Sequence, residues 1–278
     1  MRFLAFGDVV ENKEALEKLS ELDFSGYDFV LFTGDILTLL LFKKRREKRV
    51  LSGEISENEE ERRRHLKESV EEKEILQKEA VKLQGLSKFF KAIKDKAPLY
   101  GVWGNADHRW IVSQTDVSKY ITNLHLRSVK IGGFNFIGYE GRPKYIFETY
   151  ENPTERAFDE EKAFKQLSGL FEKIRGKTIF VTHAPPYKIL DQVEEKYRKY
   201  AVGTYGEKAS DGNIGSLAFK KIVEKFRPLL HVFGHVHECK GMERTEETVF
   251  VNSGSLGKDP EYVEIRIDRK IEVEFVKL

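Results

Sequence analysis

The sequence predicts an α/β domain in which two β-sheets pack between layers of helices. Two features of the 278 residues lead to this prediction. Short apolar runs alternate with segments of helical spacing over most of the chain, and the C-terminal part, from about residue 248, contains closely spaced strand patterns. The chain has no internal repeat and no low-complexity linker, so residues 1–278 are expected to form a single domain, with a charged helical insertion at about residues 39–93.

The first three elements predict a parallel pair of strands. Residues Arg2–Phe6 are short, apolar and bounded by Gly7, which is typical of a buried strand. Asn12–Leu22 carries its apolar side chains at helical spacing, and Phe29–Phe32 is the next apolar run. A strand–helix–strand order of this kind favours parallel strands joined by a right-handed crossover.

The segment from Leu39 to about Ile93 interrupts this alternation. A basic run at 43–49, a break at Gly53 and a capping box at Ser56–Glu59 predict two helices, the first at about residues 37–51 and the second beginning near Glu57. The second helix carries one apolar stripe, which consists of Leu66, Val70, Leu76, Ala80, Leu83, Leu86, Phe90 and Ile93.

Two interpretations of this insertion stay open. In the first, it is a solvated arm whose apolar stripe packs against its own hairpin partner. In the second, it is a lid, a contact in a homo-oligomer or a nucleic-acid contact. Nucleic acid is the least favoured partner, because the basic run is interleaved with acidic residues and lacks aromatic side chains for base stacking.

The remaining elements continue the α/β pattern. Two Gly residues at 132–133 predict a hairpin, and the long loop at 184–216, with one short helix at about 193–200, is expected to be functional or mobile. The other expected helices are residues 153–174 and 217–226. The other expected strands are residues 99–103, 178–182, 229–233, 248–251, 262–267 and 271–276.

The composition narrows the class of protein and its setting. The 48 basic and 46 acidic residues nearly cancel, to a net charge of +2, so no global field favours nucleic acid or an anionic membrane. The single cysteine excludes an intramolecular disulfide, and no apolar stretch is long enough for a signal peptide or a membrane span. A cytoplasmic location is expected, and the many Lys and Glu residues with few Cys and Met favour a thermophilic source.

Five apolar runs each stop at a residue that can bind a metal ion. These residues are Asp8, Asp35, Asn105, His183 and the pair His235 and His237. Each has an ordinary explanation as turn chemistry when taken alone. Their recurrence at strand ends is more informative, because the active crevice of α/β sheets lies beyond the carboxyl ends of the strands.

The residue types define the kind of metal site. Two carboxylates, one amide oxygen and three imidazoles form a mixed oxygen and nitrogen set, which suits Mn²⁺, Fe, Zn²⁺ or Co²⁺ rather than Ca²⁺. Six ligands exceed the need of one tetrahedral ion, so two ions sharing a bridging ligand are expected.

The ordered motifs Gly7-Asp8, Gly34-Asp35, Gly104-Asn105-Ala106-Asp107, Thr182-His183 and Gly234-His235-Val236-His237 resemble those of the calcineurin-like metallophosphoesterases, in particular the small archaeal and bacterial phosphodiesterases. The resemblance implies a four-layer α/β/β/α sandwich of two mixed sheets around two divalent ions, with manganese expected and iron, zinc, cobalt or nickel as alternatives. It also implies that Asp35 bridges the ions. Asp8 and His237 would hold the first ion, and Asn105, His183 and His235 the second.

Two positions depart from the family pattern. The family's first motif is Asp-x-His, whereas this chain has Val10, so the first ion loses a ligand and its site is expected to be weak. Asn12 matches the family's Asn, and either Glu11 or Asn12 is an alternative ligand for that ion. Ala106 occupies the place of the histidine that assists the leaving group, and His108 is the candidate catalytic replacement.

The resemblance therefore implies a metal-dependent phosphoric ester hydrolase. A phosphodiesterase acting on a small phosphoester is favoured over a monoesterase, since a missing general acid biases the substrate toward good leaving groups. The alternative is a catalytically degenerate scaffold that mediates protein interactions. Candidate substrate contacts in the loops are Arg142, Lys188, Tyr205, Lys208 and Asn213.

Overall fold

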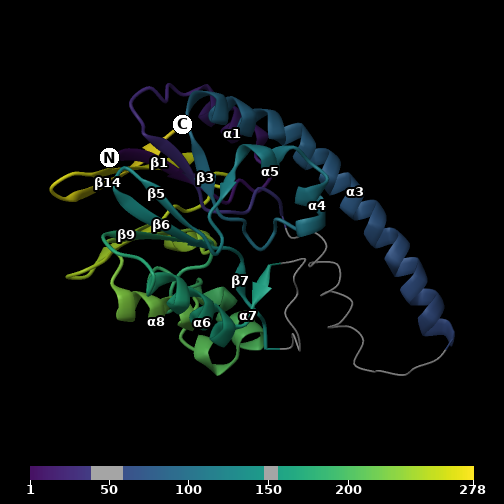
Figure 1. The fold of residues 1–278 in the computed structure, drawn as a ribbon. Helices are drawn as coiled ribbons and strands as arrows, with labels where there is room; N and C mark the ends of the chain where they lie inside the picture. The colour runs from purple at the N-terminus through teal and green to yellow at the C-terminus, as the bar shows by residue number, and fades with distance from the viewer. Residues whose placement is uncertain (39–58, 147–155) are drawn as a thin grey trace.

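The computed structural model describes residues 1–38, 59–146 and 156–278, with the side chains of 59–72 excluded (Figure 1). Its first sheet has six strands in the order β14, β13, β1, β2, β3 and β4. Strand β1 is parallel to β2, which is parallel to β3, whereas β13 is antiparallel to both β1 and β14. The bounds are β1 Arg2–Phe6, β2 Phe29–Phe32, β3 Leu99–Gly101, β4 Thr122–Asn123, β13 Glu261–Ile267 and β14 Ile271–Lys277.

The second sheet also has six strands, in the order β11, β12, β10, β9, β6 and β5. Its four inner strands are parallel, and the edge strands β11 and β5 are antiparallel to their neighbours. The bounds are β5 Ser128–Ile131, β6 Phe134–Tyr139, β9 Thr178–Thr182, β10 Leu230–Phe233, β11 Gly241–Arg244 and β12 Val249–Asn252. A short pair, β7 Arg142–Pro143 and β8 Ala157–Phe158, lies outside both sheets.

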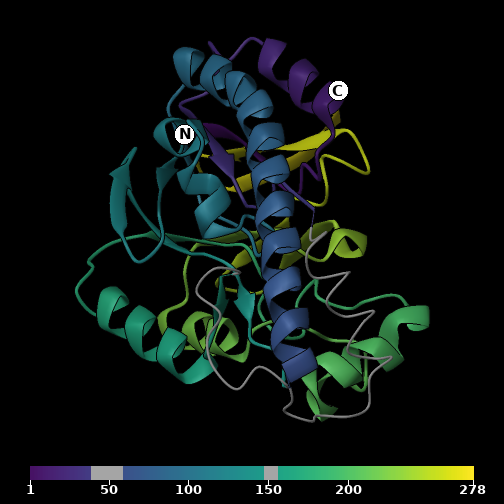
Figure 2. The same cartoon turned by 90° about the vertical axis from the view of Figure 1, so that its right-hand side faces the viewer.

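Helices cover the outer face of each sheet (Figures 1 and 2). The first sheet carries α1 Lys13–Glu21, α3 Glu59–Lys96, α4 Arg109–Ser113 and α5 Val117–Tyr120. The second carries α6 Glu160–Phe171 and α8 Leu217–Phe226. A helix α7 Glu195–Tyr205 and two short 3₁₀ turns, η1 Glu207–Ala209 and η2 His237–Cys239, lie in the connections near the second sheet.

Three apolar layers hold this arrangement together: one between the two sheets, and one between each sheet and the helices that cover it. In β1, Leu4 and Phe6 face the helices, whereas Phe3 and Ala5 face the second sheet, because successive strand side chains point to opposite faces. Both faces of the strand are therefore buried, which is why it reads as a continuous apolar run. The four-layer α/β/β/α sandwich of two mixed sheets is confirmed.

Helix α3 differs from the prediction of a hairpin arm. Its C-terminal half is part of the domain core, where Leu83, Phe90 and Ile93 pack with α1 and the first sheet. Its N-terminal end extends away from the sheets (Figure 1). The expected first helix, the break at Gly53 and the capping box at Ser56 lie outside the described residues, so the bounds of the insertion stay a prediction.

Most other elements lie at the predicted positions, and the differences are local. Ala157 was expected in a helix but belongs to β8, and α6 begins only after Asp159, whose side chain accepts from the backbone N–H of Glu161 and Lys162. The short helix expected in the 184–216 loop is longer, extending to Tyr205. Strand β11 was not predicted, because its side chains are mostly exposed and show no apolar pattern. Among the described residues, no helix is long and apolar enough to cross a membrane.

Candidate metal centre

The structure brings residues from both sheets together at the carboxyl ends of parallel strands. Asp8, Asp35 and Asn105 follow β1, β2 and β3 of the first sheet, and His183 and His235 follow β9 and β10 of the second. The edges meet because both sheets stack through the shared inner core. The sequence prediction that these strand ends converge is therefore correct for this group.

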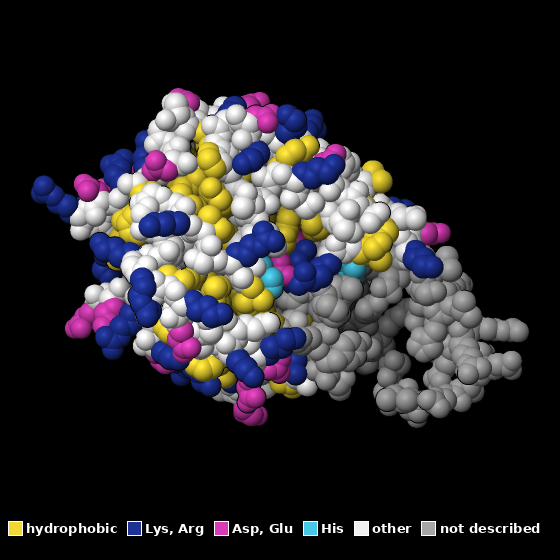
Figure 3. Space-filling model, in the orientation of Figure 1, with side chains coloured by type: hydrophobic (Ala, Val, Ile, Leu, Met, Phe, Trp, Pro, Cys, Tyr) yellow, Lys and Arg dark blue, Asp and Glu magenta, His cyan; other side chains and the backbone are white. Residues whose placement is uncertain are grey.

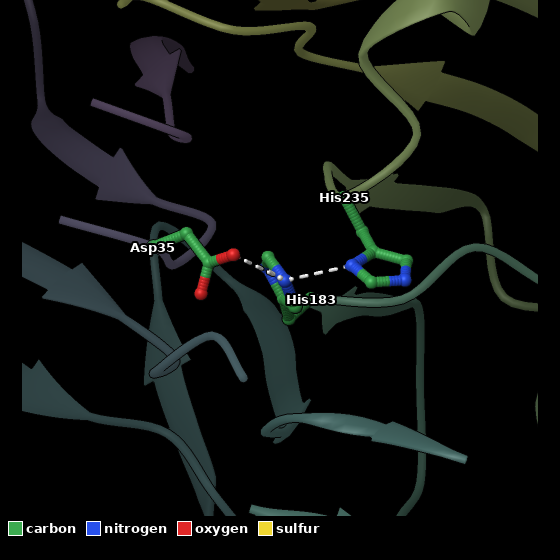
Figure 4. Close-up of side chains that lie close together, drawn as sticks. All are labelled: Asp35, His183 and His235. Atoms are coloured by element: carbon green, nitrogen blue, oxygen red, sulfur yellow. Dashed lines mark hydrogen bonds and ion pairs between the residues drawn. The ribbon is translucent and has the colours of Figure 1, made fainter. Parts of the chain in front are cut away.

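His183 is the centre of the first cluster (Figure 4). Its Nε2 lies 2.9 Å from Asn105 Oδ1, 3.3 Å from Asp35 Oδ2 and 3.2 Å from His235 Nδ1. Its Nδ1 lies 2.9 Å from the carbonyl oxygen of Thr33, to which it donates. That bond fixes the ring so that Nε2 faces the other donors.

The second cluster joins Asp8 to the turn after β10. His237 Nε2 lies 2.8 Å from Asp8 Oδ1, and the backbone N–H of His235 donates to Asp8 Oδ2 at 3.0 Å. Asp8 is fully buried, whereas the His237 side chain is 21% exposed. The Asp8 carbonyl oxygen is held from the far side by Ser255 Oγ at 2.8 Å and by the N–H of Gly257 at 3.0 Å.

The charges in these clusters shift the pKa values in opposite directions. Burial lowers the pKa of His183, but Asp35 and Asp8 outweigh it and raise that pKa to about 9. Burial and the neighbouring His183 lower the pKa of His235 well below its usual value. For His237, burial also lowers the pKa, but Asp8 raises it by more. In the metal-free molecule, His183 is therefore the protonated imidazole of its cluster, and His235 is neutral.

The alternative ligands near the first site are engaged elsewhere. Asn12 was a candidate metal ligand, but it is the N-cap of α1: its Oδ1 accepts from the N–H of Ala15, and its Nδ2 donates to the carbonyl oxygen of Gly257. Glu11 accepts from Thr38 Oγ1 at 2.6 Å and from Lys82 Nζ at 3.3 Å. Both side chains thus have hydrogen-bond partners outside the cluster, and a ligand role for Asn12 or Glu11 stays a prediction.

The candidate catalytic residue and three of the candidate substrate contacts lie in different surroundings. His108 is the N-cap position of α4, and its catalytic role stays a prediction. Lys188 and Lys208 form ion pairs with Asp211 at 3.2 Å and Glu160 at 3.4 Å. Arg142 is buried, and its guanidinium lies 3.4 Å from the centre of the Tyr145 ring.

Tyr205 and Asn213, the other two candidate substrate contacts, both make contacts within the protein. Tyr205 is buried and packs its ring against Tyr145. Asn213 pairs with Gln192 in an isolated β-bridge, and its backbone N–H donates to Asp211 Oδ1. Substrate contact by any of these loop residues stays a prediction.

Asp107 is the last residue of the motif Gly104-Asn105-Ala106-Asp107, and the sequence pattern predicts no role for it. Its buried carboxylate accepts backbone N–H groups from the loops after β2 and β3, which carry the candidate ligands Asp35 and Asn105. The signal was an Asp two residues after Asn105, which is also ordinary turn chemistry.

The donor spacing fits a metal ion. Donors about 2.1 Å from an octahedral ion lie roughly 3.0 Å from their neighbours on that ion. The contacts of His183 Nε2, at 2.9 to 3.3 Å, have this spacing. Asp35, His183 and His235 each offer a ligand atom within 4.8 Å of the others. The residues present therefore fit a divalent cation with mixed oxygen and nitrogen ligands.

The two-sheet sandwich and the group of side chains at its strand ends that could hold a metal ion suit a metal-dependent hydrolase. The family model for calcineurin-like phosphoesterases matches residues 1–239. The chain belongs to this family, whose members are metal-dependent phosphoric ester hydrolases.

Relatives and solved structures agree with this placement. A UPF0046 protein of Caenorhabditis elegans is 29% identical over 139 residues, which cover 50% of this chain and 39% of that protein. Human metallophosphoesterase domain-containing protein 1 is 32% identical over 79 residues, which cover 28% of this chain and 20% of that protein. The matches thus span less than half the length of these curated relatives.

Two solved structures share the fold across nearly the whole chain. A dimetal phosphatase from Danio rerio superposes with a TM-score of 0.60 at 11% identity, covering 100% of this chain and 97% of that one. The Thermus thermophilus protein TT1561 superposes with a TM-score of 0.58 at 18% identity, covering 98% and 97%.

Proposed function

We propose that this protein is a phosphodiesterase that hydrolyses a small phosphoester at a centre of two divalent metal ions. The observation that carries the proposal is the meeting of six donor residues, from the strand ends of both sheets, with the spacing of ligands on an ion. The Danio rerio protein, described as a dimetal phosphatase, is an example of such chemistry on the same fold.

The residues divide into two groups around Asp35. Asn105, His183 and His235 would hold one ion, Asp8 and His237 the other, and Asp35 would be shared. When bound, two such ions lower the pKa of a water molecule and neutralise charge on the phosphoryl oxygens. The protein keeps Asp8 and His183 fully buried, so these ligands are not exposed to competing water.

The first site is the weaker one in this proposal. Val10 cannot bind a metal ion, and Asn12 and Glu11 make other contacts. Asp8 and His237 therefore hold their ion with fewer side-chain ligands, and we expect the ion at His183 to remain longer during purification. Manganese is the proposed metal, in line with the family resemblance, and the mixed carboxylate, amide and imidazole set also suits iron, zinc, cobalt or nickel.

The substrate preference follows from Ala106. Without an imidazole at that position, the leaving group gains no proton there, and general acid catalysis is worth roughly 10²- to 10⁴-fold. A diester with a good leaving group loses least. Figure 3 shows histidine side chains at the surface with Lys and Arg side chains close by, a setting that suits an anionic phosphoester.

The test is metal-stripped protein assayed with Mn²⁺, Fe²⁺, Zn²⁺ and Mg²⁺ on bis-p-nitrophenyl phosphate and p-nitrophenyl phosphate. We expect Mn²⁺-dependent turnover with the diester preferred, and its loss in Asp35→Asn. The matched control is Asp268→Asn, an exposed residue in the β13–β14 turn at the opposite edge of the sheet, with wild-type turnover. Full activity in Asp35→Asn would show that the site is assigned wrongly.

The alternative, an interaction scaffold, rests on Val10 and Ala106. It predicts a protein that purifies without metal and shows no turnover under any of these conditions. Metal content per chain separates the two functions, because the phosphodiesterase requires bound ions and the scaffold does not.

A further inference from the structure

We propose that Asp107 is a positioning residue that fixes the shared ligand Asp35 for metal binding. This inference rests on the proposed function, because it concerns the same metal centre. It adds a residue that contacts neither substrate nor ion and acts through the ligand loops.

The Asp107 carboxylate joins two loops that are distant in the sequence. It is fully buried, and its Oδ2 accepts from the backbone N–H of Asp35 and of Gly104, each at 2.9 Å. Its Oδ1 accepts from the N–H of Ile36 at 2.8 Å. One side chain thus binds the loop after β2 and the loop after β3, which hold ligands of the same cluster.

The bonding between the loops is reciprocal. Asp35 Oδ1 accepts from the backbone N–H of Ala106 at 2.7 Å, so each loop presents a carboxylate to an N–H of the other. This contact leaves Asp35 Oδ2 as the oxygen that faces His183 Nε2, at 3.3 Å. The rotation of the Asp35 side chain is therefore set by the loop that Asp107 holds.

Two glycines allow this close approach. A Cβ on Gly34 would lie 2.5 Å from the backbone nitrogen of Gly104, and a Cβ on Gly104 would lie 1.9 Å from Asp35 Oδ1. Asp35 itself has a φ of 59°, in the left-handed region that L-residues rarely adopt. The N–H bonds to Asp107 hold the backbone in this conformation.

A second buried pair supports Asp107 from outside. Arg156 Nε donates to the Asp107 carbonyl oxygen at 2.6 Å, and Arg156 Nη1 lies 2.8 Å from Glu140 Oε2. Both members of this ion pair are almost fully buried, with side-chain exposures of 4% and 2%. The backbone of Asp107 is therefore fixed independently of its carboxylate.

The change Asp107→Asn tests the proposal. An amide can accept at only one of its two atoms, so at least one N–H bond becomes a donor–donor contact. Outer-sphere partners of metal ligands typically change affinity by roughly 10- to 100-fold, so we expect the Mn²⁺ dissociation constant to rise by about that factor. It is measured by chelator competition, together with the thermal unfolding midpoint with and without Mn²⁺.

The matched control is Asp191→Asn. Asp191 is also buried, and its carboxylate accepts from the N–H of Gly215 at 2.8 Å and of Lys188 at 3.0 Å, but these bonds lie in a loop without metal ligands. A merely structural role for Asp107 would lower the unfolding midpoint of Asp107→Asn and leave Mn²⁺ affinity at the wild-type value in both variants. A positioning role weakens Mn²⁺ affinity in Asp107→Asn alone.

The outcomes distinguish this proposal from the proposed function. Wild-type protein that binds no Mn²⁺ would end the proposed function and this inference with it. Wild-type binding with equal affinity in Asp107→Asn would overturn the inference alone. If Asp107→Asn gives no folded protein, Asp107→Ser replaces it, because the shorter side chain cannot bind the N–H groups of both loops. Weaker Mn²⁺ affinity there supports the proposal, and unchanged affinity overturns it.

Discussion

Metal binding to this protein should displace a proton from His183. Burial lowers the pKa of His183 in the metal-free molecule, but Asp35 and Asp8 outweigh burial and raise it to about 9. Its Nδ1 donates to the Thr33 carbonyl oxygen, so the proton that titrates is on Nε2, which faces the other ligands. An ion held by these ligands needs that nitrogen unprotonated.

The size of the effect follows from the pKa. A value of about 9 lies roughly two units above pH 7, which weakens binding at pH 7 by about 100-fold, or about 3 kcal/mol, relative to the deprotonated site. Apparent Mn²⁺ affinity should therefore rise by roughly tenfold for each pH unit up to about pH 9 and then level off. Against the effect of burial, Asp8 also raises the pKa of His237. The affinity for the ion at Asp8 should therefore also increase with pH.

The assay is isothermal titration of metal-free protein with Mn²⁺ at pH 7 in two buffers of different ionisation enthalpy. We expect about one proton released for the ion held at His183. The control is His125→Asn, because His125 lies outside the ligand cluster and contacts Glu140 instead. Affinity independent of pH between 7 and 9, with no proton release, would refute the reasoning.

Two further predictions concern stability. Phe90 in α3 is fully buried, so Phe90→Ala should lower the free energy of unfolding by about 3–5 kcal/mol in urea titrations. Val81 lies on the same helix but is 73% exposed, so Val81→Ala should change that free energy by less than about 0.5 kcal/mol; equal effects would place α3 outside the core. Burial raises the pKa of Asp191 to about 6, above its unfolded value of 3.8, so its contribution to stability is greatest below pH 3.8 and is lost as pH rises through 6. That loss amounts to about 3 kcal/mol, and Asp191→Asn should remove it; an unchanged pH profile of the unfolding free energy in this variant would contradict the assignment.

The sequence was sufficient to predict the sandwich and the meeting of the main ligands. Both depend on local patterns: apolar runs of strand length, a Gly at most of the exits and a polar residue after it. Parallel strands put their carboxyl ends at one edge, so Asp35, Asn105 and His183 had to lie close together once the sheets packed.

The apolar periodicity of a helix predicts which of its faces is buried, but it does not identify the element that covers this face. The stripe on α3 showed that one side of the helix is buried, but the same stripe fits a hairpin and a sheet. Leu83, Phe90 and Ile93 contact the core of the first sheet, and only the three-dimensional arrangement decides this. The apolar pattern of α3 therefore predicted the burial of Leu83, Phe90 and Ile93, and α1 and the first sheet, rather than a hairpin partner, cover these three side chains.

Residue type was insufficient where one side chain has two ordinary uses. Asn12 matches a ligand-motif position and is also a preferred N-cap, and the start of α1 uses it as the cap. Asp107 reads as turn chemistry, yet it binds N–H groups of Asp35 and Ile36, which lie 72 and 71 residues earlier. Contacts of that range depend on sheet packing, which spacing along the chain does not encode.

Backbone strain favours a metal-binding enzyme over a scaffold. Ten non-glycine residues among those described have a positive φ, and five of them lie in loops that carry the candidate ligands: Asp8, Val10, Glu11, Asp35 and His235. Such residues cost about 1–3 kcal/mol each, so together they cost an amount comparable with the net stability of a domain. An interaction scaffold has no use for carboxylates and imidazoles aimed at one buried point. Contacts such as those of Asp107 and Ser255 hold the strained loops with their side chains directed inward, as the hydrolysis of a phosphoester at bound metal ions requires.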